Sequence, residues 1–459
     1  MAKEKVKIHF LGGAGDVTGS NFLFETTSLP KNLRFLIDCG MFQSSRVCDQ
    51  RNSKKFEFDP ASIDVLFVTH SHIDHVGRIP KLVRDGFKGA IYSTPPTMEL
   101  SQAMLIDSLG VLTKEAKKHN ETVFYEEKDV LDTMALWKTL DYKQILNIGP
   151  IGVRLLDSGH ILGSAMVEFH FNSKKIVFTG DLGNTPTPLL RDTEIIKGAD
   201  YLVMESVYGD RNHESKTERK EKLENVIEDT FKVRGTLLIP AFSLERTQEI
   251  LFEIERMMEQ SRIPLVPVYV DSPLAIKVIN IYKKYQDYFN KNIQDLTNAG
   301  NRIFEFPQVH LTPDTDQSRE IDKSDLPKII IAGAGMSNGG RIVHHEKRFL
   351  PNSRTTLLLI GYQSPGTMGR RLQEGEKRVT MFGESVDIRA KIVTIGGYSA
   401  HKDSNGLLEW VSTTVDTLKR VFVVMGEPRS SMFLVQRIRD YLGVSATAPI
   451  LGEVVELEL

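Results

Sequence analysis

Short runs of apolar residues, separated by glycine, serine and polar turns, fill the chain up to about Ser206. Runs of this length and composition predict β-strands. We expect them at VKIHFLG, NFLFET, RFLIDCG, VLFVTH, AIYST, VRLLDSG, SAMVEFHF, KIVFTGD and YLVMES. Helical segments lie between them, and the longest surrounds MELSQAMLIDSLGVLTKEAKKH. Its last turns, KEAKKH ending at His119, are typical of an exposed helix face.

After Tyr208 the pattern changes to longer units. Strands expected at TLLIPAF, VPVYVD, KIIIAGAG and TTLLLIGY alternate with helical stretches such as ERTQEILFEIERMMEQ, which predicts βαβ units and a mainly parallel sheet. From about Arg389 two further strands, AKIVTIGG and RVFVVMGE, are expected to finish the first domain's sheet. The chain shows no internal repeat and no long linker, so we expect an α/β protein in which residues 208–388 are inserted between 1–207 and 389–459.

Composition narrows the class of protein. The chain has 459 residues, 41% of them hydrophobic and 26% charged, which is typical of globular domains. A formal net charge of -2 argues against coating nucleic acid by bulk charge, although a local basic groove stays open. Cys39 and Cys48 form no CxxC pattern, so we expect a reducing, cytoplasmic compartment. We expect no signal peptide and no association with a membrane.

The strongest chemical signal directly follows the predicted strand VLFV. Within six positions the chain places three histidines and one aspartate: His70, His72, Asp74 and His75. Neutral imidazole and carboxylate oxygen are ligands that zinc accepts. An exposed polar loop with chance histidines is the alternative, but the whole chain has 12 histidines, which makes three in one loop improbable.

Two glycine-flanked residues extend this cluster. His160 lies in DSGHILGS and Asp181 in FTGDLGN, each next to an expected strand. Alone, each is consistent with an ordinary turn; together with the first cluster they supply enough ligands for two metal ions, and a carboxylate can bridge both. Asp38, at the end of FLID, is either a turn residue bonded to its own backbone or an acceptor that fixes a ligand imidazole.

These motifs resemble a known family. HSHIDH resembles the HxHxDH signature of metallo-β-lactamase-fold hydrolases. LGGAGDVTGS, LIDCG, SGHILGSA, FTGDLG and MESVYGDRNH follow in the order of the β-CASP branch, and PAFSLERTQE, VDSPLA, GAGMSNGGRIVHH, GYQSPGTMGRR and GYSAH extend the resemblance over nearly the whole chain. That branch contains RNA nucleases similar to RNase J and to the endonuclease subunit of the cleavage and polyadenylation machinery. The resemblance implies an αββα sandwich with an inserted β-CASP domain.

The resemblance also implies roles for individual residues. His70, His72 and His160 match the ligands of one zinc ion, Asp74 and His75 match those of a second, and Asp181 bridges them. Glu205 and His401 match an acid–histidine pair that protonates the leaving group. The implied catalytic residues are therefore Asp74, Asp181, Glu205 and His401. The family usually has a histidine where this chain has Met425, which implies a second zinc site that is weaker than the first.

Contacts to the substrate are indicated only by local patterns. Four residues lie in or next to strand-to-helix turns that suit an anion: Ser243, Arg246, Arg341 and His344. Helix capping by Ser243 and ordinary solvated charges explain them as well.

We therefore expect a zinc-dependent hydrolase that cuts the phosphodiester bonds of single-stranded RNA internally, from the 5′ end, or both. The alternatives are a small-molecule hydrolase of the same fold, such as a thioesterase or lactonase, and a catalytically impaired RNA-binding homologue because of Met425. The oligomeric state stays open, a homodimer included.

Overall fold

Two compact units divide the chain. One comprises residues 1–212 and 401–459, and the other comprises residues 213–400. The computed structural model describes residues 5–27, 32–43, 49–171 and 173–458, so Cys48 lies outside the described residues. An insertion in the middle of the chain agrees with the sequence pattern, but the inserted unit begins and ends later than the expected range 208–388.

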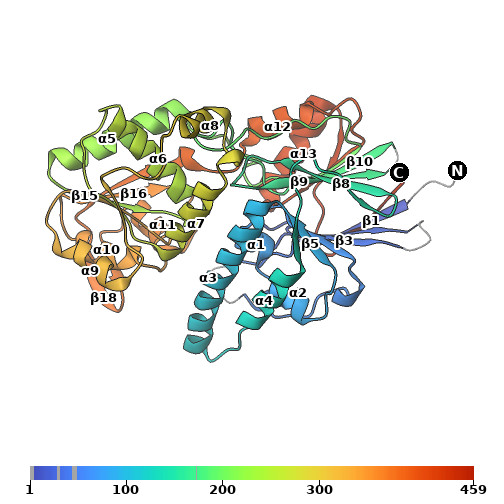
Figure 1. Ribbon diagram of the computed structural model, residues 1–459, viewed down its shortest axis with the longest axis horizontal. Helices are drawn as coiled ribbons and strands as arrows, with labels where there is room; N and C mark the ends of the chain where they lie inside the picture. Colours follow the sequence, from blue (N-terminus) through green and yellow to red (C-terminus); the bar gives the residue numbers. More distant parts are fainter. Residues whose placement is uncertain (1–4, 28–31, 44–48, 172, 459) are drawn as a thin grey trace. The chain divides into compact units, whose positions relative to one another are not determined.

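The first unit contains two seven-stranded sheets (Figure 1). The first sheet has the order β22-β1-β2-β3-β4-β5-β6, with β22 (Val454–Glu458), β1 (Lys5–Gly12), β2 (Asn21–Thr26), β3 (Arg34–Ile37), β4 (Val65–Phe67), β5 (Ala90–Ser93) and β6 (Trp137–Thr139). The second has the order β21-β20-β11-β10-β9-β8-β7, with β21 (Ser445–Thr447), β20 (Arg420–Val424), β11 (Tyr201–Glu205), β10 (Lys174–Phe178), β9 (Ala165–Phe171), β8 (Ile151–Asp157) and β7 (Leu146–Ile148).

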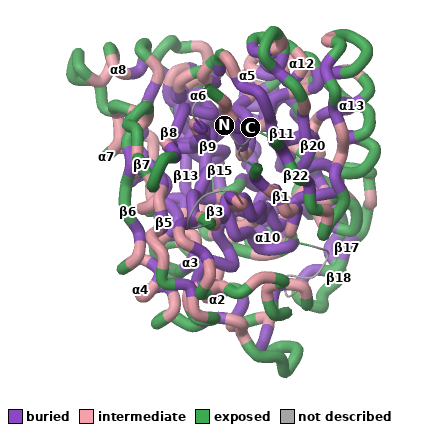
Figure 2. The backbone as a smooth tube through the Cα atoms, turned by 90° about the vertical axis from the view of Figure 1, so that its right-hand side faces the viewer, coloured by how far each residue is buried: buried purple, intermediate pink, exposed green. Residues whose placement is uncertain are grey.

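Aromatic side chains join the inner faces of these two sheets. The ring centroids of Phe24 and Phe169 are 5.0 Å apart, and those of Phe35 and Phe169 are 5.4 Å apart. All three rings are buried in one core cluster that draws side chains from both sheets. Fully burying a side chain of this kind stabilises the folded state by about 2–3 kcal/mol. The sandwich is therefore held by a dry aromatic core, and Figure 2 shows buried positions along its central strands.

Helices cover the outer faces of both sheets. Leu82, Leu105 and Val130 pack on the first sheet from α2 (Ile79–Arg84), α3 (Pro95–His119) and α4 (Glu127–Leu136). Leu407 and Leu434 pack on the second from α12 (Ser404–Ser412) and α13 (Pro428–Leu442). The predicted αββα sandwich is thus confirmed. The expected long helix is α3, which Thr94 caps and whose last residues, including His119, are exposed as predicted.

The second unit is built on one parallel sheet. Its order is β14-β13-β15-β12-β16-β19, with β14 (Val309–Leu311), β13 (Val268–Val270), β15 (Lys328–Ala332), β12 (Thr236–Pro240), β16 (Thr356–Ile360) and β19 (Lys391–Ile395). The helices of this unit are α5 (Lys216–Lys232), α6 (Arg246–Glu259), α7 (Pro273–Lys284), α8 (Lys291–Asn298), α9 (Thr315–Lys323), α10 (Ile342–Phe349) and α11 (Met368–Gln373). A separate hairpin joins β17 (Arg378–Met381) to β18 (Glu384–Asp387).

One strand corrects the sequence-based assignment. AKIVTIGG was expected to complete the first domain's sheet, but β19 pairs in parallel with β16 and belongs to the second unit. A short apolar run specifies a strand without specifying its partner, because pairing depends on residues distant in sequence. RVFVVMGE does join the sandwich, where β20 lies between β11 and β21.

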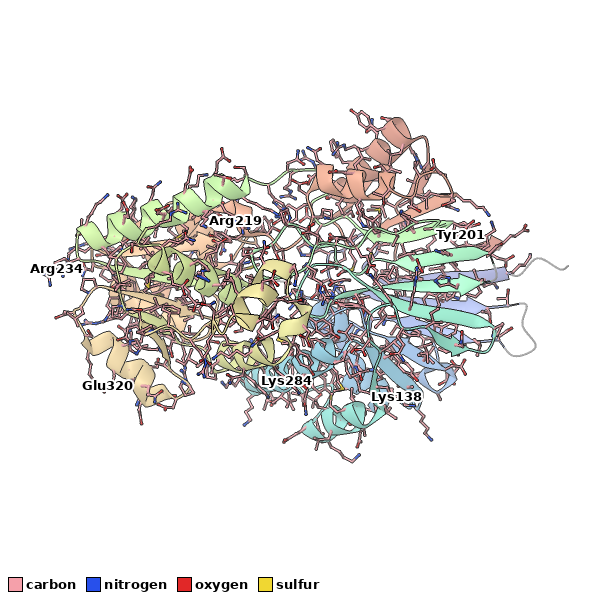
Figure 3. The ribbon with its side chains drawn as sticks, turned by 45° about the horizontal axis from the view of Figure 1, so that its top comes forward. Lys138, Tyr201, Arg219, Arg234, Lys284 and Glu320 are labelled. Atoms are coloured by element: carbon pink, nitrogen blue, oxygen red, sulfur yellow. The ribbon has the colours of Figure 1, made fainter. Side chains whose placement is uncertain are left out.

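A buried charged network stabilises the second unit. Arg219, which α5 carries (Figure 3), donates to Glu249 at 2.7 Å, to Glu253 at 3.1 Å and to the carbonyl of Gly397 at 2.9 Å. Its guanidinium lies 4.3 Å from the ring centroid of Tyr398, whose hydroxyl also donates to Glu253. Both glutamates therefore contact the Arg219 guanidinium, and Glu249 also pairs with Arg246, which offsets the cost of burying the two carboxylates.

Among the helices of the described residues, none combines the length and the apolar composition that crossing a bilayer requires.

Candidate active site

The predicted metal ligands meet at one rim of the sandwich. Within the second sheet, β8, β10, β11 and β20 all run in the same direction, because β9 is antiparallel to both β8 and β10. His160 follows β8, Asp181 follows β10, and Glu205 ends β11. In the first sheet, Asp38 and His70 follow the parallel strands β3 and β4. The carboxyl ends of these strands bring side chains from distant parts of the sequence together.

Glycines allow the loops at this rim to approach closely. A Cβ at Gly40 would lie 1.5 Å from the carbonyl oxygen of Asp74, and a Cβ at Gly183 would lie 1.8 Å from the carbonyl oxygen of Gly159. No side chain fits at such distances. The glycines of LIDCG and TGDLGN are therefore required by the packing of the site's own loops.

Four of the predicted ligands converge on one point. The ligand atoms of His70, His72, His160 and Asp181 all lie within 4.8 Å of one another. His72 Nδ1 lies 3.0 Å from His70 Nε2 and 3.2 Å from His160 Nε2. Burial and the ring of His70 hold the pKa of His72 well below its usual range, and burial and His401 do the same for His160. These imidazoles are therefore neutral, which is the form that binds a metal ion.

Asp38 fixes the ring of His75. Its Oδ2 lies 2.7 Å from His75 Nδ1, and the same carboxylate accepts from the hydroxyls of Ser20 at 3.0 Å and Thr69 at 2.9 Å. A carboxylate accepts only, so His75 Nδ1 carries a proton and the ring turns Nε2 toward Asp181. Thr69 donates to Asp38 and can therefore only accept from His70 Nδ1, 3.1 Å away, which leaves His70 Nε2 with its lone pair.

Two atoms of the cluster are buried without a hydrogen bond. His75 Nε2 and Asp181 Oδ1 lie 3.5 Å apart, and neither has a hydrogen-bond partner among the described residues. Asp74 Oδ2 lies 3.9 Å from the same nitrogen. Although burial lowers it, Asp181 and Asp38 raise the pKa of His75 well above its usual range, so these two atoms require a cation between them: a proton, or a metal ion that replaces it. The donor set, with imidazole nitrogens on one side and carboxylates on the other, thus fits divalent metal ions.

His401 and Glu205 lie next to this cluster. His401 Nδ1 is 3.2 Å from Glu205 Oε1 and 3.8 Å from Asp181 Oδ2. The backbone of His401 forms a β-bridge with Gly183, which places its ring beside that of His160, with centroids 4.6 Å apart. Although burial lowers it, the carboxylates of Glu205 and Asp181 raise the pKa of His401 to about 9. The arrangement suits a proton donor held by a carboxylate.

Met425 follows β20 at the same rim. Its backbone N–H donates to the carbonyl of Gly13 at 2.6 Å, and its φ is 49°. The side chain is 2% exposed and belongs to the core between the two sheets. A Cβ at Gly13 would lie 2.3 Å from its sulfur atom. The thioether is thus packed against the glycine-rich loop GGAGD that precedes β2.

The four candidate substrate contacts belong to the second unit and differ in their surroundings. Ser243 Oγ lies 3.1 Å from Ser272 Oγ, at the carboxyl ends of β12 and β13. Arg246 is buried and pairs with Glu249. Arg341 donates to Asp271 at 2.7 Å and to the carbonyl of Thr312 at 2.7 Å. His344, by contrast, is exposed on α10.

Sequence reasoning missed two polar residues of the site. The hydroxyls of Ser20 and Thr69 complete the hydrogen bonds of Asp38, although neither was singled out. Thr69 directly precedes His70, and this adjacency could have suggested it. Ser20 lies on a loop whose proximity depends on the fold, and nothing in its local sequence marks it.

Three family models match successive parts of the chain. They are the metallo-beta-lactamase superfamily over residues 15–240, the Beta-Casp domain over 247–372, and the Zn-dependent metallo-hydrolase RNA specificity domain over 385–449.

Curated relatives match over nearly the whole chain. The chain is 34% identical to a ribonuclease of Thermus thermophilus, TTHA0252, covering 92% of this chain and 94% of that protein. It is 31% identical to the transcription termination factor FttA of Methanosarcina mazei, over 96% of this chain and 70% of the relative, and 30% identical to that of Pyrococcus horikoshii, over 97% and 70%. A solved structure of a protein of unknown function from Enterococcus faecalis has the same fold, with a TM-score of 0.56 and 11% identity over 99% of this chain and 100% of the other.

Proposed function

The chain belongs to the β-CASP branch of the metallo-β-lactamase superfamily and is a metal-dependent ribonuclease, and we propose that it uses zinc to cut single-stranded RNA. One observation carries the proposal: four ligand atoms, three from neutral imidazoles and one from Asp181, converge beside the pair of His401 and Glu205. Mixed imidazole and carboxylate ligation suits zinc, whereas magnesium keeps mostly oxygen partners.

We assign the residues as follows. His70, His72 and His160 would hold one ion, Asp74 and His75 a second, and Asp181 would bridge them. Bound zinc ions would supply an activated water and neutralise charge on the phosphate. Asp38 holds the ring of His75 through its Nδ1 proton, and Thr69 does the same for His70. These contacts orient the two rings before any ion binds.

The leaving oxygen needs a proton, and His401 can deliver it. Glu205 accepts from the backbone N–H groups of Leu182 at 2.7 Å and Val207 at 3.2 Å, so its carboxylate is fixed in place. A fixed carboxylate beside Nδ1 holds the imidazole in one orientation and favours its protonated form. Glu205 is thus assigned to position and charge His401, and His401 to donate the proton.

A cleavage assay tests the proposal. Metal-stripped protein would be reloaded with zinc and incubated with end-labelled single-stranded RNA and with DNA of the same sequence. We expect zinc-dependent cleavage of the RNA, lost in His72→Ala and in Asp181→Ala with the fold intact by circular dichroism. His119→Ala is the matched control, because His119 is an exposed histidine of α3. Full activity in either site variant would disprove the assignment.

The same assay addresses the open alternatives. Product length separates internal cleavage from removal of nucleotides at the 5′ end. Zinc-loaded protein that binds RNA but leaves it intact would favour the catalytically impaired homologue. A cytoplasmic location, inferred from the cysteine pattern, and the oligomeric state stay predictions.

A further inference from the structure

An exposed aromatic side chain of the second unit adopts an unfavourable backbone conformation. Phe382 and Gly383 form the two-residue loop between β17 and β18, since Met381 and Glu384 are the last paired residues. Their φ angles are 51° and 79°. Two positive φ angles define a type I′ turn, whose first position strongly favours asparagine, aspartate or glycine. A bulky residue there is a genuine outlier.

Packing in the hydrophobic core does not explain why position 382 is a phenylalanine. Its side chain is 58% exposed, so it contributes little to burial, while it strains the turn. The rest of the hairpin is well anchored: Val379, Met381 and Val386 are buried in a cluster with Val343 and Phe349 of α10. Figure 1 shows β18 beside α10. A rigid hairpin therefore carries a strained, exposed ring at its tip, and such strain is characteristic of functional positions.

The ring of Phe382 is stacked on a histidine. Its centroid lies 4.5 Å from that of His344, with 24° between the two planes. His344 is itself exposed on α10, so the stacked rings of Phe382 and His344 form an aromatic pair at the surface. Stacked aromatic side chains of this kind offer a flat face to a nucleobase, and every base has a π-face that can use it.

Helix α10, which carries His344, exposes only basic side chains. His344 and Arg348 are exposed and Lys347 is half-buried, while the acidic residue of the helix, Glu346, is fully buried. Residues three and four apart lie on the same helix face. Lys347 also donates to Glu384 at 2.6 Å, which ties the helix to the hairpin. Because Glu384 balances the charge of Lys347, Arg348 supplies the positive charge beside the exposed aromatic face, and this is the combination that binds single-stranded nucleic acid.

We infer that Phe382, stacked on His344 above the basic face of α10, is a binding platform for an unpaired base of the RNA substrate. This inference rests on the proposed function and adds a binding contact for the RNA outside the metal cluster. One base stacks on the open face of Phe382, and a neighbouring phosphate contacts Arg348. The platform requires single-stranded RNA, because bases in a duplex do not expose their faces.

Binding can be measured apart from cleavage. The full chain carrying Asp181→Ala would be titrated into a fluorescein-labelled oligouridylate of about 16 nucleotides, and separately into an RNA duplex of the same length, by fluorescence anisotropy. Phe382→Asn should weaken binding of the single strand about tenfold, since stacking on one aromatic side chain contributes this much. Binding of the duplex should not change. Phe382→Tyr should restore binding of the single strand.

The turn itself supplies a second readout. Asparagine suits the left-handed position, so Phe382→Asn should raise the melting temperature by about 2 °C while it weakens RNA binding. A residue with only a structural role would not show these opposite effects. His344→Ala, which removes the ring beneath Phe382, should weaken binding in the same direction.

Controls separate this inference from the proposed function. Tyr441→Asn removes another exposed aromatic ring, 72% exposed at the end of α13, and should leave RNA binding unchanged. Unchanged binding of the single strand by Phe382→Asn, or an equal loss on the duplex, would overturn the platform even if the unmodified protein cleaves RNA. Loss of binding in Phe382→Asn, with no RNA cleavage by the zinc-loaded protein, would support the platform and reject the nuclease.

Discussion

Glu205 Oε1 accepts a hydrogen bond from the backbone N–H of Leu182 at 2.7 Å and also lies 3.2 Å from His401 Nδ1. One oxygen atom therefore links the loop that carries Asp181 to the histidine that follows the inserted unit. Because Glu205 and His401 are in direct contact, substitutions of these two residues should not act independently.

We expect His401→Ala to slow the chemical step by about 10²–10⁴-fold, as loss of a general acid does, with the metal content unchanged. Glu205→Gln keeps an oxygen for Leu182 but removes the charge beside the imidazole. The double variant should then be less impaired than the product of the two single effects. Single-turnover cleavage rates test this, and strictly multiplicative losses would argue against a shared role.

The second metal site should gain from a histidine at position 425. Met425→His adds an imidazole at the rim, and histidine tolerates the left-handed backbone found there better than most residues. We expect the unmodified protein to lose its second zinc first on dialysis and to gain activity when zinc or manganese is added. Met425→His should retain more metal, measured by elemental analysis.

Met425→Leu is the matched control, because it preserves the packing against Gly13 without offering a ligand. Equal, chelator-resistant occupancy of both sites in the unmodified protein would contradict the idea of a weak second site.

Breaking the buried network of the second unit should be costly. Arg219 is 4% exposed and contacts both Glu249 and Glu253, so Arg219→Met removes the cation beside Glu253, while Glu249 keeps its pair with Arg246. We expect the free energy of unfolding of this unit to fall by about 3 kcal/mol. Urea denaturation monitors the loss.

Lys222→Met, on the same helix, removes an exposed pair with Glu214 and should cost less than about 1 kcal/mol. Similar losses in both variants would show that burial does not decide the contribution.

The buried carboxyl group of Glu346 should make the free energy of unfolding depend on pH. Burial raises the pKa of Glu346 to about 8, although Ser337 donates to it at 2.5 Å. The folded state therefore keeps a proton that the unfolded chain releases near its ordinary value, so the free energy of unfolding falls as pH rises toward 8. His345, whose pKa is raised to about 9 by hydrogen bonds with Asp271 and Asp322 despite its burial, acts in the same direction as pH rises through 9.

Glu346→Gln removes the first contribution. At pH 9 the variant should be more stable than the unmodified protein by on the order of 2 kcal/mol, because no buried charge has to form. At pH 5 it should be equal or slightly less stable, since the amide oxygen can accept from Ser337 but the amide nitrogen takes the place of Oε2, which has no hydrogen-bond partner among the described residues. Parallel pH profiles of the two proteins would contradict the role of Glu346.

The sequence was informative wherever chemistry is local. Apolar runs predicted the central strands, and HSHIDH predicted a ligand cluster, because each of these patterns lies within a few consecutive residues. Short edge strands such as β6, β7 and β14 were missed, since three residues carry too little periodicity. The burial of Arg246 was beyond reach: Glu249 lies only one helical turn away, but the sequence does not show that the fold buries both side chains and so turns Arg246 into a partner of Glu249 instead of an anion contact.

The interleaving of the first unit with the inserted unit has a consequence for synthesis. On the ribosome, β11 emerges long before β20, its parallel neighbour, and β1 long before β22, which covers its edge. The inserted unit, residues 213–400, can fold as a separate body during that interval. The nascent sandwich meanwhile exposes two unpaired strand edges, which are templates for aggregation. His401 follows the insertion, so the proton donor that we propose can reach the site only after the inserted unit has been synthesised.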